Sequence, residues 1–121
     1  MIILDSSVWI GYFRKSDTVV RELLAEGQIL LHPFVFGELL LGGLPTKCEI
    51  SEQLLSLIQC PVASPSESVA FIEWAKLAGT GIGYVDTHLL ISAKLLDGGK
   101  ILTHDKSLHA QAEKLGLAYI P

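Results

Sequence analysis

The sequence alternates short apolar runs with longer amphipathic segments, and this alternation restricts the fold more than any other feature. Runs short enough to form buried strands occur at residues 1–4, 28–32, 60–63, 100–103 and 117–120. Segments with apolar residues at helical spacing occur at residues 6–14, 17–26, 33–41, 49–59, 66–78, 84–96 and 105–115. Strands that alternate with helices favour a mainly parallel sheet that is covered on both faces. The sequence therefore predicts an α/β fold.

Composition excludes two classes of protein but leaves the partner open. Charged residues make up only 18% of the 121 residues, and the mean hydropathy is +0.45, so a disordered chain is excluded. The longest stretch without a charged residue spans 53–66 and contains two prolines, whereas a membrane-spanning helix needs roughly 18 apolar residues. The net charge of −4 argues against a nucleic-acid partner, unless four of the acids bind metal and leave a neutral surface. Asp5 follows the first apolar run without a basic leader, so we expect a cytoplasmic protein.

Four carboxylates interrupt apolar segments. Asp5 ends the first predicted strand and Asp105 follows the fourth, while Asp86 lies in the first turn of a predicted helix. Glu38 lies among apolar residues in the helix predicted at 33–41, where an ionised carboxylate is costly unless a cation or hydrogen bonds compensate for it. Ligands of open α/β sheets bind beyond the carboxyl ends of the strands. We therefore expect the four acids to converge at that edge.

Each acid also has an ordinary structural explanation. Asp5 and Asp105 are suitable N-caps for the helices that follow them, and the helix macrodipole favours an anion at Asp86. Glu38 could occupy a single solvated stripe of its helix. The combination is more informative, because clustered carboxylates repel one another unless a divalent cation neutralises them. An all-oxygen site suits Mg²⁺ or Mn²⁺ rather than zinc.

Three segments resemble motifs of the PIN-domain ribonucleases, especially the VapC-type toxins of bacterial and archaeal toxin–antitoxin pairs. The segment 1–10, MIILDSSVWI, resembles the family's opening, in which an apolar strand is followed by Asp, Thr or Ser, and Ser. Glu38 resembles the family's second acid, and the segment 86–93, DTHLLISA, resembles the helix of the third. The segment 102–105, LTHD, resembles the Thr-x-Asp motif that supplies the fourth acid. The order and spacing of these motifs extend over nearly the whole chain.

The resemblance implies a PIN-like three-layer α/β/α sandwich with a central, mainly parallel sheet, formed by residues 1–121 as a single domain. It implies a toxin with Mg²⁺- or Mn²⁺-dependent endoribonuclease activity, in which Asp5, Glu38, Asp86 and Asp105 are the catalytic and metal-binding acids. Thr103 and Ser6 would orient the carboxylates or a water molecule. Many members carry a further acid where this chain has Ser107, and often an Arg where it has His104, so one metal ion is expected rather than two.

The expected partners are an RNA substrate, a cognate antitoxin and a second copy of the chain. Half of the residues are apolar, so a chain of this size is expected to expose an apolar patch. Candidates for this patch lie on short amphipathic helices: Val19, Val20, Leu23, Leu24, Leu54, Leu57 and Ile58. The alternative is that these helices face the core. By the resemblance, an antitoxin would also bring a cationic group to the acidic site.

Two other functions were weighed. A catalytically silent PIN-like module would only bind RNA or a protein, but the full set of four acids argues against it. A phosphoryl-transfer enzyme of the haloacid-dehalogenase type would have a second Asp two residues after the first, where this chain has Ser7. The glycine-rich segment 79–83 follows a predicted helix rather than a strand, which favours an active-site connection over a phosphate-binding loop.

Overall fold

A computed structural model, in which residues 1–45 and 48–121 are described, confirms the predicted α/β architecture. The elements in chain order are β1 (Ile2–Leu4), α1 (Ser6–Arg14), α2 (Thr18–Ala25), β2 (Ile29–Leu31), α3 (Pro33–Leu41), α4 (Glu49–Leu55), β3 (Ile58–Gln59), α5 (Pro65–Trp74), α6 (Tyr84–Leu95), β4 (Lys100–Leu102) and α7 (Lys106–Lys114). Among these residues, no helix is long and apolar enough to cross a membrane.

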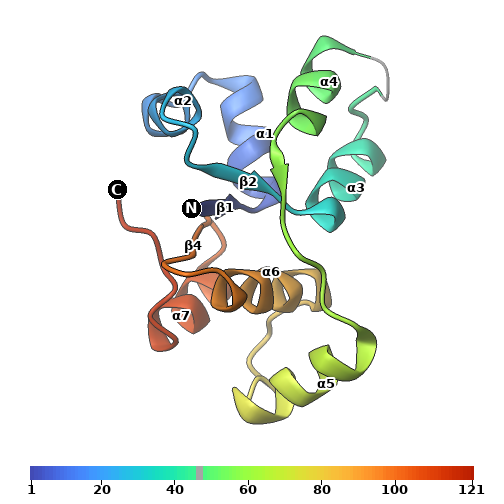
Figure 1. Cartoon of the computed structure of the whole chain (residues 1–121), viewed down its shortest axis with the longest axis vertical. Coiled ribbons are helices and arrows are strands. Elements are labelled where there is room, and N and C mark those ends of the chain that lie inside the picture. Colours follow the sequence, from blue (N-terminus) through green and yellow to red (C-terminus); the bar gives the residue numbers. More distant parts are fainter. Residues whose placement is uncertain (46–47) are drawn as a thin grey trace.

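The four strands form one parallel sheet in the order β3-β2-β1-β4, as Figure 1 shows. The central strand β1 pairs with β2 on one side and with β4 on the other, where Leu4 is opposite Leu102. This pairing brings the residues that follow β1 and β4 next to each other. The carboxyl ends of all four strands meet at one edge of the sheet, because the strands are parallel.

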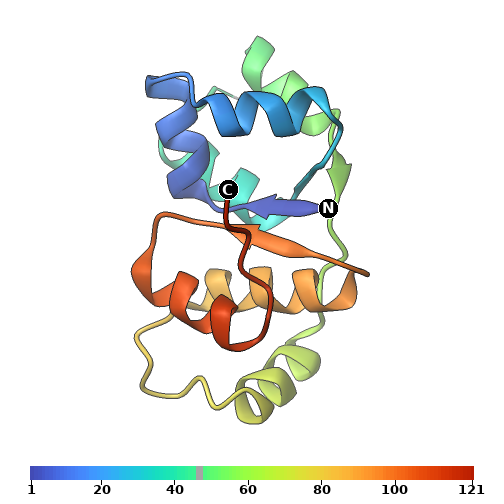
Figure 2. The same ribbon diagram turned by 90° about the vertical axis from the view of Figure 1, so that its left-hand side faces the viewer.

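Helices cover both faces of the sheet (Figure 2). α1 and α2 lie on one side of β1 and β4, and α6 and α7 lie on the other, with α5 packed outside α6. Trp9 of α1 and Leu89 and Leu90 of α6 are completely or almost completely buried. The apolar runs of β1, β2 and β4 are buried, and the helices form a layer on each side of the sheet, as the α/β/α prediction requires.

Several element boundaries differ from the sequence prediction. The third strand lies at Ile58–Gln59 instead of 60–63, because Pro61 has no N–H to continue the ladder. The helix predicted at 66–78 ends at Trp74, since Lys76 has a left-handed backbone conformation with φ of 54°. The predicted strand at 117–120 is reduced to a single bridge between Ala118 and Ile101.

The expected apolar patch on α2 and α4 is mostly absent, because these helices turn their apolar faces inward. Val20, Leu23 and Leu54 are buried in the core, and Val19, Leu24 and Leu57 are partly buried against it. Only Ile58 is exposed among the seven residues named for this patch. The alternative, that these helices face the core, is the correct one.

One glycine is required by a close approach of the chain to itself. A Cβ at Gly99, between α6 and β4, would lie 2.4 Å from the carbonyl oxygen of Ala93. Any side chain there would collide with the backbone of α6. Gly99 therefore allows β4 to start directly beneath the end of α6.

Candidate active site

Asp5 is held by three donors at the carboxyl end of β1. Its carboxylate is only 5% exposed, and it caps α1 by accepting the Val8 N–H at 3.2 Å. The Ser7 hydroxyl donates to Oδ1 at 2.5 Å, and the Thr103 hydroxyl donates a short hydrogen bond to Oδ2. These hydrogen bonds fix the orientation of both carboxylate oxygens. Asp5 can therefore cap α1 and still belong to the site.

Thr103 connects two of the predicted acids. Because β1 and β4 are paired, Thr103 lies beside Asp5 and donates its hydroxyl hydrogen to that residue. The same hydroxyl oxygen accepts the backbone N–H of Asp105 at 2.9 Å. Asp105 in turn caps α7 by accepting the N–H of Leu108 at 2.9 Å, and its side chain is exposed.

Asp86 shows that the four acids influence one another. It lies in the first turn of α6, where its carboxylate is partly buried. The pKa of Asp86 is raised to about 6, first by burial and then by the negative charges of Asp5, Asp105 and Glu38. A carboxylate in this position gains from any cation that reduces the repulsion. The edge of the sheet therefore carries a concentrated negative charge.

Glu38 is exposed, although its apolar sequence neighbours suggested a buried carboxylate. It lies in the middle of α3, but its side chain is exposed, as are Phe34 and Leu41 at neighbouring positions on that helix. The expected cost of burying this carboxylate is therefore not incurred. Its link to the other acids is the contribution it makes to the raised pKa of Asp86, which is smaller than those of Asp5 and Asp105.

Ser7, which sequence reasoning did not select, replaces Ser6 as a contact of Asp5. Ser7 donates to the Asp5 carboxylate, and its hydroxyl oxygen accepts the backbone N–H of His104 at 3.3 Å. Within the described part of the chain, the Ser6 side chain forms no hydrogen bond. The sequence prediction named Ser6, and the rotation of α1 about its axis places the adjacent Ser7 against Asp5 instead.

The segment 79–83 borders this edge, as expected for an active-site connection. A Cβ at Gly83 would lie 3.9 Å from Oδ2 of Asp86, and one at Gly81 would lie 3.7 Å from the hydroxyl oxygen of Ser107 in α7. Gly79 and Gly81 have positive φ angles of 76° and 84°, which side-chain-bearing residues rarely adopt. The segment thus runs close to the acids, and its glycines leave that space free of side chains.

The donor set suits a hard divalent cation that keeps most of its water ligands. Over residues 1–45 and 48–121, no three His, Cys, Asp or Glu side chains lie close enough together to enclose an ion. Mg²⁺ is usually bound through one or two carboxylates and several waters, so a closed cage is not required. In the same residues no Lys or Arg forms an ion pair with any of the four acids. The negative charge at this edge therefore has no internal counter-ion.

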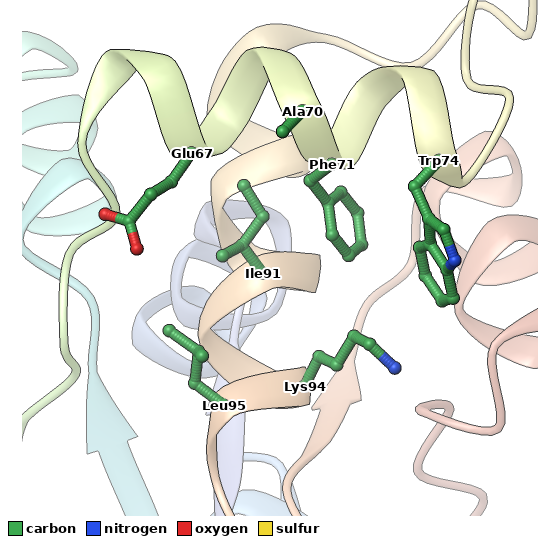
Figure 3. A pocket seen from close by; sticks show the side chains of 7 residues that line it. All are labelled: Glu67, Ala70, Phe71, Trp74, Ile91, Lys94 and Leu95. Atoms are coloured by element: carbon green, nitrogen blue, oxygen red, sulfur yellow. The ribbon is translucent and has the colours of Figure 1, made fainter.

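The most spacious cavity described lies elsewhere, between α5 and α6 (Figure 3). It has a volume of about 490 Å³ and is lined by Glu67, Ala70, Phe71, Trp74, Ile91, Lys94 and Leu95. The Lys94 ammonium lies 4.5 Å from the centroid of the Trp74 ring. None of the four acids lines this cavity, which we call the α5–α6 groove.

Comparisons with known proteins agree with the motifs and the fold. The chain is 36% identical over 118 residues to Ribonuclease VapC32 from two strains of Mycobacterium tuberculosis, CDC 1551 and H37Rv, covering 98% of this chain and 95% of each relative. The crystal structure of PAE2754 from Pyrobaculum aerophilum superposes with a TM-score of 0.56 at 13% identity, covering 91% of this chain and 84% of the other. That likeness supports the fold alone. The family model described as PIN domain matches residues 2–114, and the chain therefore belongs to the PIN-domain family.

Proposed function

We propose that this protein is a divalent-metal-dependent endoribonuclease and the toxin of a toxin–antitoxin pair. The observation that carries the proposal is the position of Asp86, whose pKa is raised to about 6 first by burial and then by the negative charges of Asp5, Asp105 and Glu38. Such crowding is unfavourable in the free protein and becomes favourable when a cation binds. The relative named Ribonuclease VapC32, which matches nearly the whole chain, supports RNA as the substrate.

Asp5, Glu38, Asp86 and Asp105 are the proposed metal-binding and catalytic acids, with Mg²⁺ or Mn²⁺ as the ion. A bound ion would supply an activated water and would shield the charge of the scissile phosphate. Thr103 and Ser7 hold the Asp5 carboxylate in one orientation through the hydrogen bonds described above. The exposed carboxylates of Glu38 and Asp105 stand at the side from which a substrate would approach.

Single-stranded or looped RNA is the proposed substrate form, because its backbone can bend towards a recessed site. The phosphates of RNA and the acids of the protein repel each other without a cation. Productive binding therefore requires the metal, in line with the net charge of −4. We propose that the protein acts in the cytoplasm as a single PIN-like domain.

An antitoxin is the proposed protein partner that controls this edge. The acids have no Lys or Arg partner among the described residues. A cationic side chain from an antitoxin would compensate their charge and compete with the metal for them. Inhibition and metal displacement would then be the same event.

The α5–α6 groove is the proposed contact between two copies of the chain. Trp74 and Leu95 are 58% and 60% exposed at its border, although both are apolar. Glu67 lies at one end of the groove, and Lys94 lies with Trp74 towards the other (Figure 3). In a two-fold symmetric dimer the groove of one copy would pack against the same groove of the other in the opposite direction. This would bring Glu67 opposite the partner's Lys94. This arrangement of charge favours a second copy over an unrelated occupant.

The activity is tested by incubating purified protein with structured RNA in Mg²⁺, in Mn²⁺ and in EDTA. We expect cleavage with either metal and none with EDTA, and no cleavage by Asp5→Asn under any condition. Cleavage in EDTA would contradict the metal mechanism. RNA binding without cleavage in every metal would favour the catalytically silent PIN-like module instead.

A further inference from the structure

A cluster of aromatic rings joins three helices beside the acidic edge. The rings of His32 and Phe34 have centroids 4.9 Å apart, and those of Phe34 and His88 are 4.8 Å apart. Tyr84 packs edge-on against His88 at 4.7 Å, and its hydroxyl lies 2.8 Å from the hydroxyl of Ser68. The cluster therefore connects α3, α6 and α5 through a continuous chain of side-chain contacts.

His32 has a defined tautomer because its side chain caps α3. Its Nδ1 accepts the backbone N–H of Phe34 at 3.0 Å, so Nδ1 carries no proton. The residue is completely buried, and burial, followed by the charge of His88, lowers the pKa of His32 to about 4. The neutral ring must then carry its proton on Nε2. This buried donor has no hydrogen-bond partner among residues 1–45 and 48–121.

His88 presents the complementary atom. It is 2% exposed, and its buried Nδ1 also has no hydrogen-bond partner in the described part of the chain. The centroids of the His32 and His88 rings are 6.4 Å apart with an interplanar angle of 61°. Two imidazoles at this separation cannot form a direct hydrogen bond, but one water between them can bond to both. Buried polar groups that lack protein partners are commonly satisfied by such a water.

We propose that His32 and His88 form a positioning pair, joined by one buried water that accepts from His32 Nε2 and donates to His88 Nδ1. His32 caps the helix that carries Glu38, and His88 lies two residues after Asp86 on its helix. The pair therefore fixes α6 against the start of α3, and with it Asp86 relative to Glu38. This inference rests on the proposed function only where it assigns those two acids to the metal site.

Two substitutions separate this role from capping and from ring packing. His32→Asn keeps an acceptor near the position of Nδ1, and Asn is a good N-cap, but the residue loses the Nε2 donor. His88→Phe keeps a ring against Tyr84 and Phe34 but loses the Nδ1 acceptor. The control is Ser92→Ala, which removes a different buried hydrogen bond of α6, from Ser92 Oγ to the Pro61 carbonyl at 2.7 Å.

Calorimetric titration with Mn²⁺ and thermal unfolding of the metal-free proteins give the decisive readouts. We expect each His variant to weaken Mn²⁺ affinity by about tenfold, as removal of groups that orient metal ligands commonly does. The double variant should bind no more weakly than either single variant, because either change alone breaks the bridge. Ser92→Ala should unfold at a lower temperature and keep the affinity of the unmodified protein. Additive losses, or full affinity in a folded His88→Phe protein, would overturn the pair.

A crystal structure of the unmodified protein tests the bridge directly. We expect one ordered water within hydrogen-bond distance of both nitrogens, and its absence would overturn the proposal. The outcome remains separate from that of the proposed function. If the unmodified protein bound no Mn²⁺, the metal site would fail, while this water and non-additive unfolding midpoints would still establish the pair.

Discussion

The acidic edge of the sheet and the α5–α6 groove are built on the same helix and have opposite chemistry. The N-terminal turn of α6 carries Asp86, which is crowded by three other carboxylates. Its C-terminal half contributes Ile91, Lys94 and Leu95 to a spacious groove that has an apolar border. Within the described residues, no Lys or Arg forms an ion pair with the acids of the edge, whereas the groove has exposed apolar surface with one acid and one base.

The difference shows that cavity size alone is a poor guide to the active site of this fold. The groove offers about 490 Å³, but Glu67 is the single carboxylate among the residues that line it. Asp105 lines a smaller cavity of about 370 Å³ at the start of α7. Burial, followed by the charges of the other three acids, raises the pKa of Asp86 to about 6. Perturbed ionisation, combined with position at the strand ends, is the better indicator here.

The largest expected effect comes from removing the most crowded carboxylate. Asp86→Asn should abolish RNA cleavage, because a charged member of the site is lost. The same change should raise the unfolding temperature of the metal-free protein at pH 7, since repulsion with Asp5, Asp105 and Glu38 disappears. Cleavage assays and thermal unfolding measure both. A variant that is stabilised but fully active would remove Asp86 from the mechanism.

Glu38→Gln tests whether the exposed carboxylate of α3 belongs to the same site. We expect cleavage to be abolished with little change in folding, because the side chain is exposed and packs against little. Circular dichroism provides the control for folding. Retained cleavage would confine the site to the other three acids.

A charge reversal in the groove should affect assembly. Lys94→Glu should raise the dimer dissociation constant by about tenfold or more, because it would place two acids opposite each other across the two-fold axis. Adding Glu67→Lys should restore the dimer, and Lys114→Glu, an equal change of charge on the exposed end of α7, should leave it intact. Light scattering after size exclusion measures the state. An unmodified protein that is monomeric at micromolar concentration would refute the dimer.

A smaller effect is expected from Thr103→Val, which keeps the shape of the side chain and removes its hydroxyl. Asp5 and the N–H of Asp105 each lose a partner, so we expect Mn²⁺ affinity to fall by about tenfold. Thr80→Val is the matched control, because the Thr80 hydroxyl donates to the carbonyl of Leu77, outside the hydrogen bonds that hold Asp5. Equal affinities for the two variants would show that the orientation of Asp5 does not matter.

The smallest effect is a pH dependence of opposite sign at two buried groups in EDTA. The pKa of Asp86 is raised from 3.8 to about 6, so its stabilising contribution is complete below 3.8 and is lost as pH rises through 6. The pKa of His32 is lowered from 6.5 to about 4, so its contribution is present above 6.5 and is lost as pH falls towards 4.

Unfolding midpoints at pH 4.5 and 7.5 separate these contributions. Lowering the pH from 7.5 to 4.5 should reduce the unfolding midpoint of Asp86→Asn more than that of the unmodified protein. The same change should reduce the midpoint of His32→Asn less than that of the unmodified protein. Parallel changes in all three proteins would contradict both assignments. In the presence of Mn²⁺, affinity should fall as pH drops below 6, because protons and metal compete for the same carboxylates.

The sequence by itself determined the class of fold and the location of the site at the carboxyl edge of the sheet. Short apolar runs between amphipathic segments specify buried strands and covering helices, because burial and helical periodicity are local properties of a sequence. Asp5 directly follows β1 and Asp105 comes three residues after the end of β4, so the parallel pairing of these strands brings them to one edge. Their capping roles were also local, since an N-cap bonds within its own first turn.

Only the tertiary structure decided which neighbours each side chain meets. Ser6 and Ser7 are adjacent in sequence, and the packing of α1 on β1 selected Ser7 as the contact of Asp5. Glu38 is exposed because its side of α3 is not covered, although its sequence neighbours are apolar. The approach of His32 to His88 joins residues 56 positions apart through helix packing. Periodicity records which residues favour burial, but the rotation and placement of each helix come from packing the whole core at once.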